Sequence, residues 1–139
     1  MEIQGNVWKD GKHWIAEVPA LDAMTQGRTK KEALEVLKDL VQEMLLSYLK
    51  AKKDVSVADC KDGIIAVSAK EMNILLALVL IRQRERSGAT VREAAERMGS
   101  NSPNAYAQYE RGMTSVSFEK YEQLLSAANP KEKWRLRVV

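Results

Sequence analysis

Hydrophobic and polar residues alternate near the start of the chain in two short runs that flank Asp10-Gly11. Asp-Gly between two runs rich in β-favouring residues is a strong hairpin signal. Alternation with a period of two also lets one face of a strand pack against a helix while the other face is exposed to solvent. The pattern predicts strands near residues 2–9 and 12–18, and AMTQ at 23–26 predicts a third short strand.

After Gly27 the apolar period becomes helical. Thr29-Lys30-Lys31-Glu32 has the sequence of a capping box, in which the threonine accepts from the Glu32 amide and the glutamate reaches back. Apolar residues then recur at spacings of three and four, which predicts a helix to about residue 50 with one stripe against the sheet. That stripe comprises Leu34, Leu37, Val41, Met44 and Tyr48.

A polar, turn-rich stretch over residues 50–63 is predicted as a loop, and residues 64–67 as one more strand. Residues 1–68 are thus predicted to form a small antiparallel sheet with one packed helix. Residues 69–139 form a second, helical module, and the complete chain is of the α+β class.

The second module opens with Ser68-Ala69-Lys70-Glu71, another capping-box sequence, before a helix containing the apolar run at 74–81. A helix that is apolar on almost every side must be central to its module. Three shorter helices follow, with N-caps predicted at Thr90, Ser102 and Ser117. The tail over residues 134–139 alternates with the period of a strand, and we expect it to pair within a dimer or with the first module.

Composition narrows the function classes. The longest strongly apolar run, Ile74 to Ile81, is far shorter than the roughly 20 residues that cross a bilayer, so we expect a cytoplasmic protein with no membrane segment. With one cysteine and one histidine the chain lacks a Cys/His set for zinc, and we expect no metal or other cofactor. Residues 1–68 carry 10 Lys+Arg and 11 Asp+Glu, a formal net charge of −1. Residues 69–139 carry 12 Lys+Arg and 8 Asp+Glu, a net charge of +4, and a basic half weakly favours nucleic-acid binding.

The segment from Thr90 to Gly112 has the layout of a helix-turn-helix, a short helix, a glycine-containing turn and a second helix that can enter the DNA major groove. Asn104 and Gln108, four residues apart, suit paired hydrogen bonds to adenine, while Ser102 and Arg111 suit phosphates. Tyr106 and Tyr109 are predicted to pack inward. The alternative is a polar surface helix of an ordinary bundle.

The stretch TVREAAERMGSNSPNAYAQYERGMTSVSFEKYEQLLSAA, residues 90–128, is similar to the Xre/phage-repressor helix-turn-helix family. In that family a Ser-Pro … Glu-Arg-Gly recognition helix is followed by a turn and a leucine-rich helix. One extra residue lies between Gly99 and Gly112 here, and tyrosines replace aliphatic residues. The resemblance implies DNA contacts by Ser102, Asn104, Ala105, Gln108 and Arg111, with Arg92 on the preceding helix as a further candidate.

The stretch HWIAEVPALDAMTQGRTKKEALEVLKDLVQEML, residues 13–45, resembles the HicB antitoxin family. The matching positions are Trp14, Ala16, Pro19, Gly27, Thr29, Glu32 and Ala33. The resemblance implies a partial ribonuclease-H-like βββαβ module that binds a HicA-like mRNA-cleaving toxin and blocks its active site. It further implies repression of the toxin–antitoxin operon by sequence-specific binding to operator DNA, a homodimer, and a larger hetero-oligomer with the toxin.

Two alternatives stay open. A nuclease with a ribonuclease-H-like fold would need converging carboxylates, for which Glu17, Asp22 and Asp10 are the candidates, or His13 as a general base. Asp10 and Asp22 fall in predicted turns, so we expect no convergence and no enzyme activity. The second alternative is an orphan transcription regulator whose N-terminal module binds a small molecule or another protein.

Overall fold

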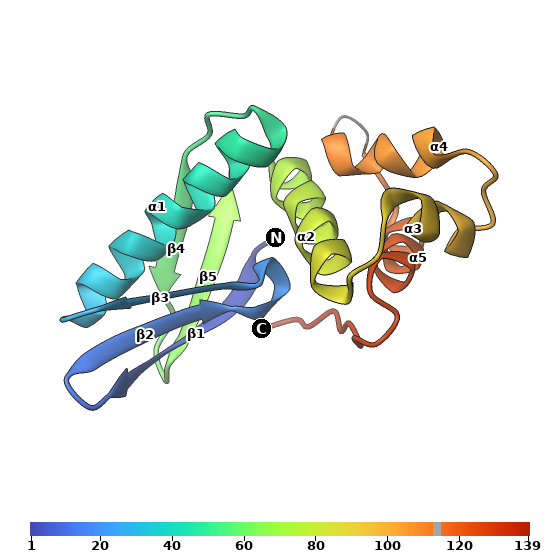
Figure 1. Cartoon of the computed structure of the whole chain (residues 1–139). Helices are drawn as coiled ribbons and strands as arrows, with labels where there is room; N and C mark the ends of the chain where they lie inside the picture. Colours follow the sequence, from blue (N-terminus) through green and yellow to red (C-terminus); the bar gives the residue numbers. More distant parts are fainter. Residues whose placement is uncertain (113–114) are drawn as a thin grey trace.

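Five antiparallel strands form one sheet in the N-terminal half of the computed structural model, which describes residues 1–112 and 115–139 (Figure 1). The strand order is β3-β2-β1-β5-β4. The strands are β1 (Ile3–Asp10), β2 (His13–Val18), β3 (Ala23–Gly27), β4 (Val55–Asp59) and β5 (Ile64–Ala69). The predicted hairpin is confirmed, with Asp10 paired to His13 across a two-residue turn in which Gly11 has a φ of 60°.

Helix α1 (Lys30–Leu49) covers one face of the sheet (Figure 1). The hydroxyl of Thr29 accepts from the Glu32 amide at 3.0 Å, as predicted, but the Glu32 carboxylate accepts from the Arg28 amide at 3.4 Å, so the box is only half formed. The residues buried along the helix are Ala33, Leu37, Val41 and Leu45. The prediction for Tyr48 was wrong, because the buried stripe follows a spacing of four to Leu45 and leaves Tyr48 39% exposed.

The contact between β3 and the start of α1 is very close. A Cβ atom on Gly27 would lie 2.6 Å from the backbone nitrogen of Ala33, so no side chain fits there. The hydroxyl of Thr25 donates to the Ala33 carbonyl at 3.0 Å, and both Ala16 and Ala33 are fully buried. Small residues therefore set the distance between the helix and the sheet.

Helix α2 (Met72–Ser87) lies between the sheet and the remaining helices (Figure 1). After α2 the chain forms α3 (Val91–Arg97), α4 (Pro103–Ala107), the 3-10 turn η2 (Tyr109–Arg111) and α5 (Phe118–Ala128). Helix α2 contacts α1, β5 and the 3-10 turn η1 (Pro19–Leu21) on the sheet side, and η2 and α5 on the other side. One cluster of buried hydrophobic residues runs through both halves, which confirms that α2 is central.

Three predictions about the modules were wrong. The stretch predicted as a loop contains β4, an edge strand in which only Val55 is buried, so its sequence shows little apolar alternation. Ser68 belongs to β5 and caps nothing, because α2 begins at Met72 without a side-chain cap. The sheet module (β1–β5 with α1) thus has the order βββαββ in place of βββαβ. The boundary between the modules near residue 68 stays a prediction.

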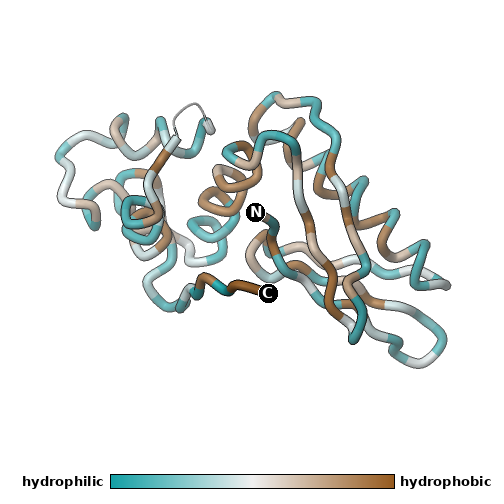
Figure 2. Tube along the Cα trace, turned by 180° about the vertical axis from the view of Figure 1, so that it is seen from behind, coloured by the Kyte–Doolittle hydropathy of each residue, from teal (hydrophilic) through white to brown (hydrophobic). Residues whose placement is uncertain are grey.

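The tail over residues 134–139 pairs with no strand of the described chain, so the predicted pairing with the first module is wrong. Pairing within a dimer stays a prediction, because a strand there would need a second copy of the chain beside it. Trp134 is half-buried against the core, whereas Leu136 and Val138 are exposed. Hydropathy along the chain shows apolar segments in the strands, in α2 and at the end of this tail (Figure 2).

Within residues 1–112 and 115–139 we find no helix whose length and hydropathy would allow it to cross a bilayer. Met113 and Thr114, in the turn predicted after the recognition helix, lie outside the described residues.

Candidate nucleic-acid interface

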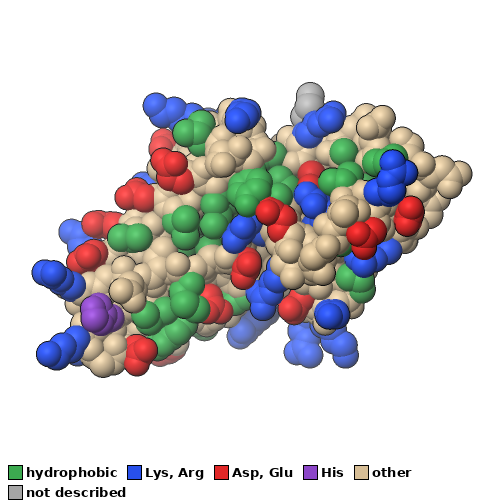
Figure 3. All heavy atoms as spheres, in the orientation of Figure 1, with side chains coloured by type: hydrophobic (Ala, Val, Ile, Leu, Met, Phe, Trp, Pro, Cys, Tyr) green, Lys and Arg blue, Asp and Glu red, His purple; other side chains and the backbone are tan. Residues whose placement is uncertain are grey.

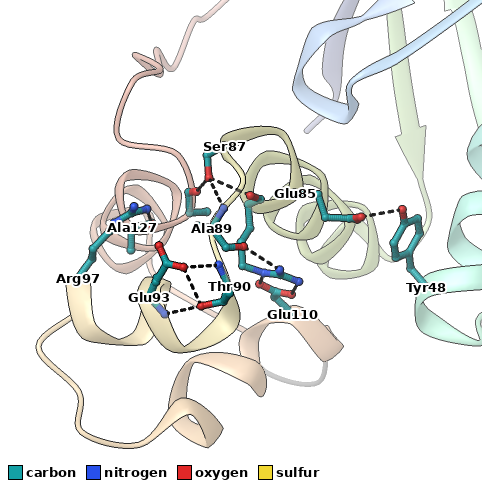
Figure 4. A network of polar contacts seen from close by, with 11 residues as sticks. Tyr48, Glu85, Ser87, Ala89, Thr90, Glu93, Arg97, Glu110 and Ala127 are labelled. Atoms are coloured by element: carbon teal, nitrogen blue, oxygen red, sulfur yellow. Dashed lines mark hydrogen bonds and ion pairs between the residues drawn. The ribbon is translucent and has the colours of Figure 1, made fainter.

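Helix α3 begins with a capping box, in which Thr90 is the N-cap that the sequence predicts. The Thr90 hydroxyl accepts from the Glu93 amide at 3.1 Å, and the Glu93 carboxylate accepts from the Thr90 amide at 3.4 Å (Figure 4). Ala94 and Ala95 are buried on its inner face and allow α4 to pack closely. Gly99, with a φ of 78°, lies in the turn that leads from α3 towards α4.

The recognition segment comprises α4 and η2. Tyr106 is 2% exposed and faces the core, whereas Asn104, Ala105 and Gln108 are exposed. Gln108 keeps helical backbone angles, φ −61° and ψ −35°, and its amide donates to the Asn104 carbonyl at 3.2 Å. Asn104 and Gln108 therefore lie one helical turn apart on the outer face of the segment, as the sequence predicts.

Two details of the recognition segment differ from the prediction. The single helix predicted up to Gly112 is divided, since α4 ends at Ala107 and a 3-10 turn follows. The Ser102 side chain forms no capping bond; instead the Ser100 hydroxyl accepts from the Ser102 amide at 3.2 Å and donates to the Ser102 carbonyl at 3.0 Å. Ser102 is exposed and stays a candidate phosphate ligand.

A largely buried ion pair holds η2 against α2. The Arg84 guanidinium donates to both carboxylate oxygens of Glu110, at 2.7 Å and 2.9 Å, and also to the Ala89 carbonyl at 3.2 Å (Figure 4). Their side chains are only 16% and 9% exposed. Hydrogen bonding to Glu110 raises the pKa of Arg84 above its usual value, so the guanidinium stays charged.

Gly112 ends the recognition segment against α2. Its φ is 69°, a conformation that favours glycine, and a Cβ there would lie 3.3 Å from the Cβ of Ala77. The Asn73 side chain donates to the Gly112 carbonyl at 2.6 Å. η2 is thus tied to α2 twice, through its middle residue Glu110 and through its C-cap Gly112.

Tyr106 and Tyr121 pack as neutral groups in this module. Burial raises the pKa of Tyr106 above its usual value, and the charge of Glu110 raises it further. Burial likewise raises the pKa of Tyr121, whose hydroxyl donates to the Leu76 carbonyl at 2.8 Å. Tyr109 is half-buried, with the Lys120 ammonium 5.6 Å from its ring centre. The inward packing predicted from the sequence is confirmed for Tyr106.

Residues 75–129 match the family model of a helix-turn-helix domain. The match extends from α2 through α5, so α3 and α4 are the two helices of the motif. No curated protein matches the chain. Because the second helix of such a motif enters the major groove, the helix-turn-helix domain supports a DNA-binding module.

The predicted contact residues lie on two helices of the helix-turn-helix domain. Ser102, Asn104, Ala105, Gln108 and Arg111 are exposed along the recognition segment, and Arg92 is exposed on α3. The domain carries seven Lys or Arg and six Glu over residues 75–129, a balance of 7 − 6 = +1. Figure 3 shows the two signs interleaved on the helical half of the visible face, so position matters more for DNA contact than total charge.

The carboxylates considered for a nuclease lie in different settings. Asp10 ends β1 at the hairpin, Glu17 is on β2, and Asp22 follows η1, where Arg82 and Arg86 approach its side chain. Within the described residues, no three His, Cys, Asp or Glu side chains are grouped so as to hold a metal ion.

Sequence reasoning missed the residues that position the interface. Arg84 and its partner Glu110 are 26 residues apart, so no local pattern joins them. The only local signal was Glu110 itself, an acidic residue in a segment that also had to pack against the core.

Replacing Gln108 by alanine is expected to cost about 1–3 kcal/mol in specific DNA binding and to relax specificity, because a paired contact to a base is lost. Binding would be measured on a duplex selected from a random pool by the wild-type chain. Gln123→Ala, at an exposed glutamine of α5, is the matched control and should bind like wild type. Wild-type affinity in the Gln108 variant would remove this residue from the interface.

Proposed function

We propose that this chain is an antitoxin of the HicB type, which binds a HicA-like toxin through its sheet module and represses its own operon through its helix-turn-helix domain. The observation that carries the DNA-binding part is the match of residues 75–129, together with the exposed polar face of α4. On this proposal the chain acts by binding and catalyses no reaction.

The chemistry of the exposed face fits the reading of base edges. Asn104 and Gln108 each carry a side-chain amide, which can donate an N–H to adenine N7 and accept from the adenine N6 amino group in the major groove. Arg111 is exposed at the end of the same segment, where a cation suits a phosphate. A repressor needs both kinds of contact, since phosphates position the protein and bases specify the site.

Replacing Arg111 by alanine is expected to weaken binding to all DNA sequences and to lower the salt slope of log K by about 0.9 for one lost phosphate contact. Affinity would be measured at several salt concentrations on the selected duplex and on an unrelated one. Arg28→Ala, an exposed arginine of the sheet module, is the control. A loss confined to the selected duplex would assign Arg111 to a base and not to a phosphate.

The sheet module supports the antitoxin part through the structural roles of its HicB-like residues. Ala16 and Ala33 are fully buried, Gly27 leaves no space for a side chain, and Thr29 caps α1. These positions determine how the helix packs on the sheet. The shared pattern therefore supports a shared module fold, and the contacts to a toxin must come from other, exposed residues.

The outer face of α1 is one such exposed surface. Acidic side chains follow this helix (Figure 3), among them Glu35, Asp39 and Glu43, all exposed. Charge complementarity would draw a basic toxin to this face and mainly raise the rate of encounter. Asp22, another exposed carboxylate of the sheet module, is instead held by arginines of α2.

A homodimer completes the proposal. Two copies would present their α4 helices to successive major grooves about 34–36 Å apart on a palindromic operator. Larger hetero-oligomers would form when each sheet module binds one toxin.

The decisive experiment is co-expression of this chain with the small open reading frame beside its gene, followed by co-purification, sedimentation and a growth assay. A stable complex and rescue of growth would establish the antitoxin, and sedimentation would give the stoichiometry. A neighbour that neither binds nor harms would contradict the antitoxin part. Operator binding by the chain alone would then favour an orphan regulator whose sheet module binds another ligand.

A further inference from the structure

Side chains of α2 bind four successive backbone carbonyls of the turn between β2 and β3. The Gln83 amide donates to the carbonyls of Pro19 and Ala20, at 3.2 Å and 2.9 Å. The Arg82 guanidinium donates to the carbonyls of Leu21 and Asp22, both at 2.9 Å. We name these four interactions the α2–turn contact.

Both donors of the α2–turn contact are themselves fixed. Gln83 is 2% exposed, and its side-chain oxygen accepts from Asn129, the buried C-cap of α5, at 3.0 Å. Arg82 also donates to the Tyr48 hydroxyl of α1 at 3.1 Å. A buried side-chain amide whose N–H groups and oxygen all form hydrogen bonds has few other conformations open to it.

Residues 84–87, in the next turn of α2, also contact both the sheet module and the helix-turn-helix domain. Glu85 accepts from the Tyr48 hydroxyl at 3.3 Å on the sheet side, and Arg86 lies 3.5 Å from the Asp22 carboxylate (Figure 4 shows the former). Arg84 binds Glu110 of the recognition segment, and the Ser87 hydroxyl donates to the Ala128 carbonyl of α5 at 2.7 Å. Residues 82–87 therefore alternate between the two modules within less than two helical turns.

We propose that Arg82 and Gln83 are positioning residues that fix the orientation of the recognition segment relative to the sheet module. A short rigid helix anchored to both sides transmits orientation, whereas a flexible linker would let the modules turn independently. This inference extends the proposed function, because a partner on the sheet module is then held at a defined place relative to the bound operator.

The test uses backbone N–H residual dipolar couplings of the full chain in a weakly aligning medium. The wild-type chain should fit one alignment tensor over both modules. Arg82→Ala/Gln83→Ala should need two tensors of different magnitude, while each module keeps its own chemical shifts. Arg28→Ala, which removes an equal charge from the sheet module, should keep one tensor. Two tensors in the wild type, or one tensor in the double variant, would overturn the proposal.

Since Gln83 is buried, its variant could lose the fold, and a second variant keeps the test decisive. Arg82→Ala/Arg86→Ala changes two partly exposed arginines and removes both cations that approach the turn. A changed ratio of the two tensor magnitudes is expected. An unchanged ratio in this folded variant would overturn the proposal.

A second readout separates positioning from general damage. If two copies join through their sheet modules, the variants should lose about tenfold in affinity on a duplex with two half-sites, because the fixed geometry that links the two binding events is relaxed. On a single half-site they should stay within about twofold of wild type, since the helix-turn-helix domain itself is intact. Equal losses on both duplexes would overturn the positioning role. The alignment measurement involves no DNA, so it decides the α2–turn contact even if the proposed function fails.

Discussion

Replacing Glu110 by alanine is expected to destabilise the helix-turn-helix domain by about 3–5 kcal/mol, because it leaves the Arg84 guanidinium largely buried without its carboxylate. Arg84 is only 16% exposed and donates twice to Glu110, so water cannot readily replace that partner. The measurement is urea unfolding followed by circular dichroism. Glu96→Ala, at an exposed glutamate of α3, is the control and should change stability by less than about 0.5 kcal/mol.

A companion variant separates charge from packing at this pair. In Arg84→Met/Glu110→Leu both charges are removed together, and an apolar pair of similar volume is often neutral in stability. Its free energy of unfolding should therefore lie well above that of Glu110→Ala. If the two variants unfold at the same urea concentration, the loss comes from packing, and the ion pair is not what holds η2 to α2.

Replacing Gly27 by alanine is expected to destabilise the sheet module by about 2–3 kcal/mol through overpacking. The new Cβ would lie 2.6 Å from the Ala33 nitrogen and 3.0 Å from the carbonyl carbon of Glu32, and backbone atoms of α1 cannot rotate away as a side chain can. The first turn of the helix must shift from the sheet. Thermal and urea unfolding, with amide exchange along α1, would measure the cost and its location.

Gly11→Ala is the matched control for this prediction. Its Cβ would meet no heavy atom within 4 Å, but its φ of 60° disfavours any side chain. We expect a cost of about 1–2 kcal/mol, from backbone conformation alone and confined to the hairpin. Normal amide protection in the first turn of α1 of the Gly27 variant would contradict the packing explanation.

Local signals in the sequence were sufficient for much of the fold. The Asp-Gly hairpin, the Thr29 and Thr90 caps and the buried alanines of α3 all depend on residues within a few positions of one another. Edge strand β4 and the tail show the limit of such signals. β4 is held by pairing with β5 and needs no apolar alternation of its own, while the tail alternates but has no partner strand in the described chain.

The residues of the candidate interface were likewise predictable in part. The outward positions of the recognition segment were predictable, because Tyr106 had to face inward and the exposed positions follow from the helical period. The Arg84–Glu110 pair and the α2–turn contact join residues 26 and about 60 positions apart. A sequence period does not reveal such long-range pairs, and Arg, Glu and Gln are residue types that occur equally well at solvent-exposed positions.

Because α2 packs against both modules, neither module can be exchanged as an independent domain. If a transplanted helix-turn-helix domain brought a first helix that lacked Arg82 and Gln83, the carbonyls of residues 19–22 would lose their donors. Inheritance of a new DNA specificity is therefore easier through the few exposed residues of α4 than through exchange of the domain. The operator can diverge while the joint between the modules stays fixed.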